Sequence, residues 1–385
     1  MTKRPRDVDA IVPALALLEK VPLTPQQILN SILEDHGMRK PSPIPVSVSH
    51  SASFAVHYGQ LDELVRLPSL QPLIKDGDKF FDLLRMSVTE FLLLHAQLAP
   101  TIVLTRKKAQ KPATSSANSH PVLSTAEQLL LWLFYTKGRD AAVMGLFFGA
   151  LHRTTVIRVC NHVSQSIQIA LGDVVRLPTP DERKLLRGWF SVCDKAIAVL
   201  DGTHCEIRKP TNDQSDYHSS YKHKHTLNYL VCVSPFALVI YVSQAIKGRG
   251  NDRGAFNRTP LATSPADFVS EGEVILADGG FHGGPQLLCP VTVTEIAAVR
   301  SEDMQLGLAG FNDELTEARV LVEDVFSWLK ARARILEGRF PQNKKRQRSV
   351  FVATCCVYNF IRMKRIAYAA ELDKSGVRSM SIDDN

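Results

Sequence analysis

Residues 196–204 read AIAVLDGTH, an apolar run that ends at Asp201, and residues 274–281 read VILADGGF, with Asp278 in the matching position. A short apolar run bounded by a turn dipeptide is typical of a buried β-strand. Asp-Gly alone is also a common turn dipeptide. Two acids that each follow a buried strand favour a functional site over a simple turn, because open sheets bind their ligands beyond the carboxyl ends of their strands.

Further strands and a long helix are expected around these two runs. The Val- and Ile-rich segments 227–233, 237–246 and 291–299 predict strands, and the amphipathic segment 313–336 predicts a helix. The predicted strands come first in the sequence, and helices are expected after and around them. This order indicates an α/β (α+β) domain. We place this domain at residues 185–365, followed by a C-terminal tail at 366–385.

A third acid lies in the expected helix. Glu323 is in the apolar run 320–326, and a carboxylate buried among apolar residues must be paired, protonated or bound to a metal. An ion pair with Arg319, one turn earlier, or an exposed face shared with Asp324 is the alternative. A site is favoured because Arg319, Glu323 and Lys330 fall on one helix surface.

Three acids suit the chemistry of phosphoryl transfer. Two divalent metal ions about 3.5–4 Å apart activate a water or 3′-hydroxyl and stabilise the leaving oxygen of an in-line displacement. Mg²⁺ and Mn²⁺ prefer oxygen ligands. Asp201, Asp278 and Glu323 are therefore the candidate catalytic and metal-binding residues. This assignment requires the strands of the two aspartates to be adjacent and parallel.

Residues 121–175 carry a helical pattern instead. The sequence STAE at 124–127 is a capping box that opens an apolar helix. A short helix at 141–148, a glycine turn and a helix from about Thr154 form a helix-turn-helix arrangement, which binds DNA through its second helix.

A plain helical bundle with a solvated basic face is the alternative for this segment. Leu151 stands where such motifs usually carry a Ser or Thr cap. In the DNA-binding interpretation, the contacts come from the start of the second helix: Arg153, Thr155 and Arg158.

Residues 1–120 give weaker signals. Proline- and serine-rich linkers are expected at 41–45 and 111–116, with a helical element at 80–98 between them.

Ordered blocks along residues 199–336 resemble the DDE superfamily endonucleases of the PIF/Harbinger transposase group, including their domesticated nuclease relatives. The blocks are VLDGTH at 199–204, YKHKHTL at 221–227, GND at 250–252 with Phe256, LADGGF at 276–281, FN at 311–312, Arg319, VE at 322–323, Phe326, LK at 329–330 and IL at 335–336. Each block is loose, but the ordered set is specific. The second-acid block, DGGFHGG at 278–284, is richer in glycine than is usual for the group.

The resemblance implies an RNase H-like mixed-sheet domain preceded by a helix-turn-helix domain. In such a domain the first acid lies on the first strand, the second on the fourth and the third on a following helix. Asp201, Asp278 and Glu323 would then bind two Mg²⁺ or Mn²⁺ ions. Asp252 matches a recurrent position of the family, but we do not assign it as a metal ligand.

The same resemblance implies DNA as the substrate, with cutting at transposon ends and joining to target DNA. A Myb-like DNA-binding protein is an expected partner, together with a homo-oligomeric assembly and a nuclear location. Expected DNA contacts in the catalytic domain are His204, Lys222, Lys224, Arg319 and Lys330. The basic run KKRQR at 344–348 is equally compatible with DNA contact, a solvated surface or a nuclear-import address.

Three other interpretations remain. Cys205, His218, His223 and His225 are close in sequence, but their spacing fits no standard zinc finger. The segment GRGNDRG at 248–254 lacks the lysine of a phosphate-binding loop and is expected to be a flexible loop. A domesticated protein that keeps the fold and binds or scaffolds DNA without cutting it is the main rival function.

Composition sets only broad limits. The 46 Lys and Arg against 39 Asp and Glu give a net charge of +7, which is compatible with a polyanionic partner without requiring one. No uncharged apolar run reaches the length of a membrane span, and Met1 to Arg6 do not resemble a secretory signal. The seven scattered cysteines are typical of reduced core thiols, so we expect an intracellular protein.

Overall fold

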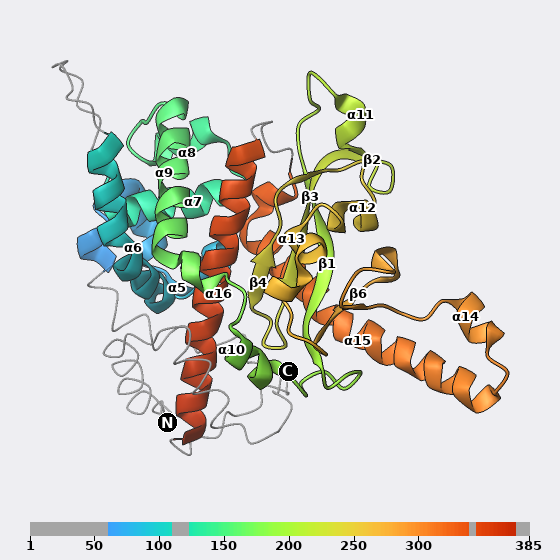
Figure 1. Cartoon of the computed structure of the whole chain (residues 1–385). Coiled ribbons are helices and arrows are strands. Elements are labelled where there is room, and N and C mark those ends of the chain that lie inside the picture. Colours follow the sequence, from blue (N-terminus) through green and yellow to red (C-terminus); the bar gives the residue numbers. More distant parts are fainter. Residues whose placement is uncertain (1–60, 110–122, 339–343, 375–385) are drawn as a thin grey trace, which may run out of the picture. The chain divides into compact units, whose positions relative to one another are not determined.

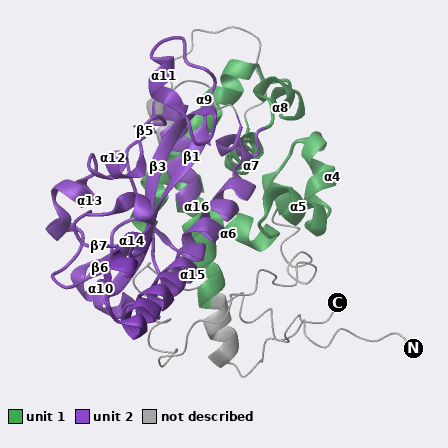
Figure 2. Ribbon diagram, turned by 90° about the vertical axis from the view of Figure 1, so that its right-hand side faces the viewer, with its two compact units in different colours: residues 1–135, 139–174, 356–385 green, residues 136–138, 175–355 purple. Residues whose placement is uncertain are grey.

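The computed structural model describes residues 61–109, 123–338 and 344–374. The chain divides into two compact units (Figure 2): unit 1 holds residues 1–135, 139–174 and 356–385, and unit 2 holds residues 136–138 and 175–355. The two linkers predicted at 41–45 and 111–116, and the tail beyond residue 374, lie outside the described residues.

Unit 1 is helical in its described part. Its elements are η1 (Pro68–Leu70), α4 (Gln71–Ile74), α5 (Gly77–Leu84), α6 (Val88–Ala109), α7 (Thr125–Thr136), α8 (Ala141–Phe147), α9 (Arg153–Leu171), η2 (Gly172–Val174) and the C-terminal part of α16 (Lys344–Lys374). The helical element predicted at 80–98 is confirmed as α5 and α6, which are separated by Arg85 in a left-handed conformation (φ 57°).

The predicted capping box at the start of α7 is present. The Glu127 N–H donates to Ser124 Oγ at 3.1 Å, and Glu127 Oε2 accepts from the Ser124 N–H at 2.7 Å. The other carboxylate oxygen accepts from the backbone N–H groups of Arg66 and Leu67 at 2.8 and 2.9 Å. The buried Glu127 side chain therefore caps the helix and holds the preceding segment at the same time.

The turn between α8 and α9 has the predicted glycine. Gly149 and Ala150 both adopt positive φ values (84° and 57°), which lets the chain reverse within a few residues. Gly145 lies so close to the turn that a Cβ there would be 2.0 Å from the Leu151 carbonyl oxygen. The cap of α9 is His152, whose Nδ1 accepts from the Thr154 N–H at 3.3 Å, whereas Leu151 is buried.

Unit 2 is built on a seven-stranded mixed sheet (Figure 1). Its strands are β1 (Ala196–Glu206), β2 (His218–Ser219), β3 (Lys224–Val233), β4 (Val239–Val242), β5 (Ile246–Lys247), β6 (Val274–Ala277) and β7 (Leu287–Leu288). The order is β2-β3-β1-β6-β7, with β4 and β5 also paired to β3. Strand β1 runs antiparallel to β3 and parallel to β6, and β6 runs parallel to β7. This mixed α/β architecture agrees with the predicted fold class and is consistent with an RNase H-like domain.

The register of the central strands places the two aspartates side by side. Leu200 of β1 pairs with Ala277 of β6. Asp201 and Asp278 follow these two residues, so they leave adjacent parallel strands at the same level of the sheet. The required arrangement of the two strands is confirmed.

Helices and short turns complete unit 2. They are α10 (Pro180–Leu186), α11 (Gln214–Tyr217), α12 (Asp252–Phe256), α13 (Pro260–Thr263), η3 (Pro265–Asp267), η4 (Gly279–Phe281), α14 (Val293–Ala298), α15 (Glu302–Arg332), η5 (Arg334–Leu336) and the N-terminal part of α16. Helix α15 contacts β1, β3 and β6 through the buried residues Leu315, Val322, Val325, Phe326 and Leu329. On α16, Phe351 stacks on Tyr229 of β3 at a centroid distance of 4.5 Å.

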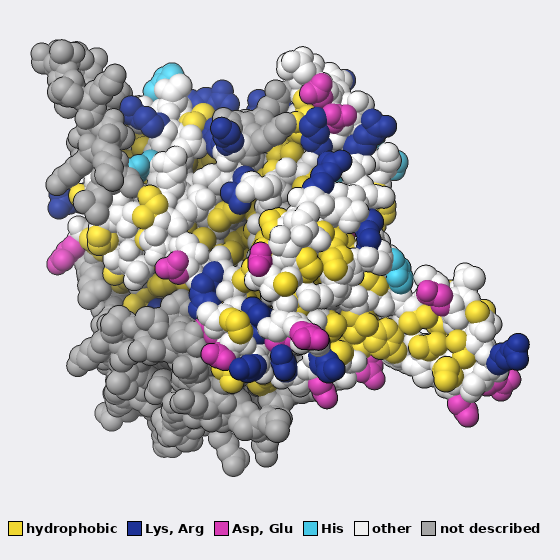
Figure 3. Space-filling model, in the orientation of Figure 1, with side chains coloured by type: hydrophobic (Ala, Val, Ile, Leu, Met, Phe, Trp, Pro, Cys, Tyr) yellow, Lys and Arg dark blue, Asp and Glu magenta, His cyan; other side chains and the backbone are white. Residues whose placement is uncertain are grey.

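The strand predicted at 291–299 is wrong, because this segment forms helix α14. Thr292 and Glu295 make a capping box, and the Val293 side chain is 84% exposed, so the β-branched residues here have no sheet to cover. The following helix begins at Glu302, well before the predicted residue 313, with Ser301 as its cap. Together α14 and the first turns of α15 extend away from the sheet (Figure 1), and apolar side chains gather on this extension (Figure 3).

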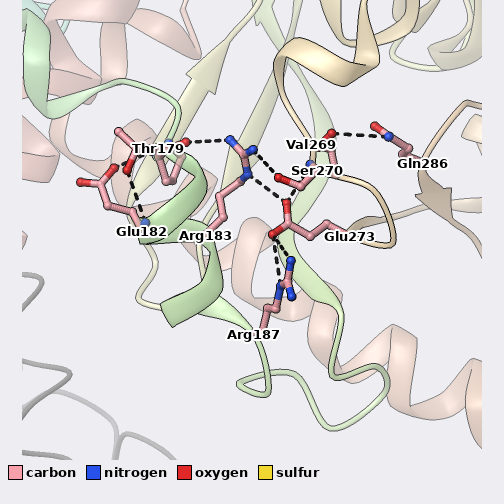
Figure 4. A network of polar contacts seen from close by, with 9 residues as sticks. Thr179, Glu182, Arg183, Arg187, Val269, Ser270, Glu273 and Gln286 are labelled. Carbon is pink, nitrogen blue, oxygen red and sulfur yellow. Dashed lines mark hydrogen bonds and ion pairs between the residues drawn. The ribbon is translucent and has the colours of Figure 1, made fainter.

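A buried ion network fixes the segment that leads into β6 (Figure 4). Glu273 is 1% exposed and accepts from Arg183 Nε at 2.9 Å and from Arg187 Nη2 at 2.7 Å. Arg183 also donates to Ser270 Oγ at 2.7 Å. Because α10 supplies Arg183, and Glu273 directly precedes β6, the network holds the strand that carries Asp278 at its end.

The segment 248–254 is not the flexible loop predicted from its glycines. A Cβ on Gly248 would lie 2.1 Å from Thr226 Oγ1 and 2.8 Å from the Tyr217 carbonyl oxygen, so this position is closely packed. Asn251 then caps α12, its Oδ1 accepting from the Gly254 N–H at 2.8 Å.

No single helix among the described residues is long and apolar enough to cross a membrane. One bent pair, α5 with residues 88–103 of α6, meets the criteria of length and composition jointly, with a 63° angle between its parts.

Candidate active site

Three carboxylates from three elements of unit 2 surround one guanidinium group. Arg319 of α15 lies 3.1 Å from Asp278 Oδ1, 3.8 Å from Glu323 Oε1 and 3.9 Å from Asp201 Oδ2. The Arg319 side chain is only 16% exposed. The structure therefore brings together the three acids selected from the sequence and shows that they point to the same place.

Asp201 is the most enclosed of the three, with a side chain 19% exposed. Burial raises its pKa to about 6, and the negative charges of Asp252 and Asp278 add to the rise. The Gly202 N–H, which donates to Asp201 Oδ1 at 2.7 Å, and the Arg319 charge oppose it. An excess of negative charge at this position is what a bound cation would offset.

Glu323 differs from expectation in its burial. Its side chain is 60% exposed, so the argument that it must be paired because it is buried is wrong. Its apolar neighbours Val322, Val325 and Phe326 are buried on another face of α15, as the 3.6-residue period allows, whereas Val320 is exposed like Glu323. Glu323 pairs with Arg319 at i,i+4, as the alternative interpretation held, and that same pair joins it to the two aspartates.

A fourth acid, Asp252 at the start of α12, lies near the two aspartates. A Cβ on Gly202 would be 3.2 Å from Asp252 Oδ1, and a Cβ on Gly280 would be 3.4 Å from its Oδ2. Burial raises the pKa of Asp252 and the Asp278 charge adds to the rise, whereas the hydrogen bond from Asn228 and the Lys222 charge lower it. The sequence signal for this residue was its recurrent family position alone.

The donor set fits hard divalent cations better than soft ones, because every candidate ligand is a carboxylate oxygen. One guanidinium stands against four acids, and Arg319 Nε is buried without a hydrogen-bond partner. Within the described ranges, no group of three or more His, Cys, Asp or Glu side chains is arranged, as it stands, to hold a metal ion. Asp201, Asp278 and Glu323 are the residues that would hold such a cation, and the Arg319 guanidinium lies among them.

The predicted DNA contacts of unit 2 have different surroundings. His204 Nδ1 is 2.8 Å from Thr226 Oγ1, and burial, with the charges of Lys222 and Lys330, lowers its pKa to about 4. A neutral His204 can orient a group but gives no positive charge to a phosphate. Lys224 pairs with Glu206 at 2.9 Å, while Lys222 lies over the ring of the exposed Tyr221, 4.6 Å from its centroid.

The predicted contacts of unit 1 lie along the start of α9. Arg153 and Arg158 are exposed and Thr155 is partly exposed. The surface they form is open to solvent within unit 1, which is compatible with both the DNA-binding and the helical-bundle interpretation.

The residues considered for zinc do not form a site in the described part of the chain. Burial raises the pKa of Cys205 to about 12, so its thiol stays protonated and is a poor metal ligand. His218 and His225 pair across β2 and β3, with ring centroids 5.4 Å apart in an edge-to-face arrangement.

Comparison with known proteins gives one match. Residues 200–359, less than half of the 385-residue chain, match the family model of the DDE superfamily endonucleases. No curated protein and no solved structure shows a significant match. The matched segment contains all four acids, the sheet from Leu200 of β1 onward, and α15. Residues 200–359 are therefore similar to the DDE superfamily of endonucleases.

Proposed function

We propose that this protein is a DDE-type nuclease and transposase that cuts and joins DNA phosphodiester bonds with two divalent metal ions, Mg²⁺ or Mn²⁺. The observation that carries the proposal is the convergence of Asp201, Asp278 and Glu323 on the Arg319 guanidinium. Asp201 lies in the middle of β1, Asp278 directly follows the adjacent parallel strand β6, and Glu323 comes from a helix packed on the same sheet.

The chain's own residues would divide the work as follows. Asp201, Asp278 and Glu323 hold the cations, which supply activation of the attacking oxygen and stabilisation of the leaving one. Arg319, which is positively charged throughout, would contact a phosphate oxygen at the edge of the site. Neutral His204, oriented by Thr226, can donate or accept one hydrogen bond at a substrate group.

The proposal also includes a transposase group, a DNA substrate, a partner protein, an assembly and a cellular location. The block pattern along residues 199–336 supports the PIF/Harbinger group, and with it DNA transposon ends as substrate, a Myb-like partner, a homo-oligomer and a nuclear location. The short helix, glycine turn and basic second helix at 141–171 support DNA binding by a helix-turn-helix.

A catalytically silent DNA-binding or scaffolding protein is the second candidate. One observation favours it: the Arg319 guanidinium already offsets part of the negative charge of the acid cluster. The exposed position of Glu323 is compatible with either function.

Nicking of a supercoiled plasmid tests the proposal. The purified full chain should nick DNA with Mg²⁺ or Mn²⁺ and not with EDTA. Asp278→Asn and Glu323→Gln should abolish nicking, whereas Asp324→Asn, which removes an exposed acid from the next position of the same helix, should retain it. DNA binding without nicking on candidate transposon ends, with the partner protein present, would favour the silent alternative.

A further inference from the structure

The carboxylate of Asp252 is closely packed beside the proposed metal centre. It begins α12, and its two carboxylate oxygens lie over two glycines, one next to each catalytic aspartate. A Cβ on Gly202 would be 3.2 Å from Asp252 Oδ1, and one on Gly280 would be 3.4 Å from Asp252 Oδ2 and 3.7 Å from Asp278 Oδ2. Any side chain at either glycine would therefore crowd the carboxylate of Asp252.

Helix α12 is fixed to the loop that follows Asp278. Arg253 donates to the carbonyl oxygens of Phe281 at 3.0 Å, of Gly283 at 2.7 Å and of His282. Phe256 packs edge-to-face on Phe281, with centroids 6.2 Å apart. Two independent contacts thus hold the helix that carries Asp252 against the turn that carries Asp278, which makes the distance between the two acids a property of the fold.

The residue that donates a hydrogen bond to Asp252 is itself incompletely paired. Asn228 on β3 is fully buried, and its Nδ2 donates to Asp252 Oδ1 at 3.4 Å. Its Oδ1 is buried and accepts no hydrogen bond. Both amide atoms lie within 3.3 Å of where a Cβ of Gly202 would be, next to Asp201. A buried amide oxygen without a donor is costly unless a bound water or cation satisfies it.

Arg319 makes no ion pair with Asp252. Its ion pairs reach Asp201, Asp278 and Glu323, and in the described part of the chain no Lys or Arg lies at ion-pair distance from Asp252. The charge of Lys222 acts on Asp252 without an ion pair at contact distance. A partly buried carboxylate beside Asp278 that has no contacting counter-charge favours a cation that arrives from outside the chain.

We propose that Asp252 is a fourth carboxylate of the divalent-cation centre, positioned by Asn228, whose free Oδ1 accepts a hydrogen bond from a cation-bound water or contacts the cation directly. This inference rests on the proposed function and adds a ligand to the three acids of that centre. It revises the sequence-based decision to leave Asp252 out of the metal site.

The test compares Asp252→Asn with the wild-type full chain, using Mn²⁺ alone as the probe. Asn has the same shape as Asp and lacks the charge. Without metal, the variant should unfold at the same or a higher temperature, because a partly buried charge is removed. With Mn²⁺, the wild type should gain thermal stability and the variant should need at least a tenfold higher Mn²⁺ concentration for the same gain. Asp267→Asn, at an acid on η3 outside the centre, is the matched control and should behave like the wild type.

Asn228→Ala supplies a second readout. It removes the group that holds Asp252 while keeping the acid, so it should weaken the Mn²⁺ response less than Asp252→Asn does. Equal Mn²⁺ responses of the wild type and Asp252→Asn would overturn the inference and leave the three-acid centre intact. A wild type that shows no Mn²⁺ response would overturn the proposed function and this inference together.

Discussion

Replacing Asp201 with Asn should make the metal-free protein more stable at neutral pH. Burial raises the pKa of Asp201 from its ordinary value of 3.8 to about 6. A raised folded-state pKa means that the folded chain prefers the protonated acid. The stabilisation is present below pH 3.8 and is lost as the pH rises through about 6. Asn carries no charge and escapes that loss.

The magnitude follows from the size of the shift. At about 1.36 kcal/mol per pKa unit, the rise from 3.8 to about 6 corresponds to an upper limit of about 3 kcal/mol at pH 7.5 and about half of that at pH 5. Asn keeps an oxygen that can accept from the Gly202 N–H, so that hydrogen bond is retained. The weak 3.9 Å contact with Arg319 is lost and reduces the gain.

Urea unfolding in EDTA, followed by circular dichroism at pH 5 and pH 7.5, measures this difference. Asp201→Asn should have the higher free energy of unfolding at both values, with the larger gain at pH 7.5. Mn²⁺ at about 1,000 times its dissociation constant should reverse the order, because it adds about 4.1 kcal/mol to the wild type for a site that the variant has lost, which exceeds the upper limit of about 3 kcal/mol. A gain that does not change with pH, or a variant less stable than the wild type in EDTA at pH 7.5, would refute the reasoning.

Two further predictions concern the scaffold. Glu273→Gln should lower the free energy of unfolding by about 3–5 kcal/mol in urea titrations, because it leaves the 6%-exposed Arg183 without its buried partner; an effect under about 1 kcal/mol would show that the network is dispensable. Gly145→Ala should destabilise the protein by several kcal/mol, since its Cβ would lie 2.0 Å from the Leu151 carbonyl oxygen. Gly172→Ala, whose Cβ meets nothing within 4 Å, should be neutral or slightly stabilising in the same thermal scan, and equal melting temperatures of the two variants would contradict the close packing of α8 on the turn.

The central strands and the capping box were predictable because their signals are local. The run before Asp201 and the run before Asp278 are apolar throughout, as strands buried on both faces must be, and both form strands. The second strand ends at Ala277 as expected, whereas β1 continues past Asp201 to Glu206, because β3 pairs with it along this stretch. Ser124 and Glu127 satisfy each other within one helical turn. Tertiary contacts change little where strands and helix caps of this kind form.

The segment 291–299 shows where a local signal misleads. Val291, Val293 and Val299 suggested a strand, but a strand needs a partner edge and a face to bury. Here the chain leaves the sheet, and the capping box of Thr292 and Glu295 decides the helix. Asn312 of α15 then holds the start of this segment with two hydrogen bonds of 2.8 Å to the Val291 backbone, a contact across the fold that no window of sequence reveals.

The site was predictable in part for the same reason. Acids at the ends of adjacent parallel strands must lie close together, so Asp201 and Asp278 could be assigned from their strands. The position of Arg319 among the acids, and that of Asp252 beside them, depends on how α15 and α12 pack on the sheet. Burial of Glu323 was wrongly predicted because Val322, Val325 and Phe326 are buried on another face of the helix, which leaves Glu323 exposed.

The number of Mn²⁺ ions bound by the full chain tests the central claim most directly. Electron paramagnetic resonance of free Mn²⁺, titrated against purified protein, should give two bound ions per chain for the wild type and for Asp324→Asn. Asp201→Asn, which removes the most enclosed of the three acids, should lose at least one of the two ions while remaining folded. Equal Mn²⁺ binding by Asp201→Asn and the wild type, or no binding by either, would contradict a metal centre built on Asp201, Asp278 and Glu323.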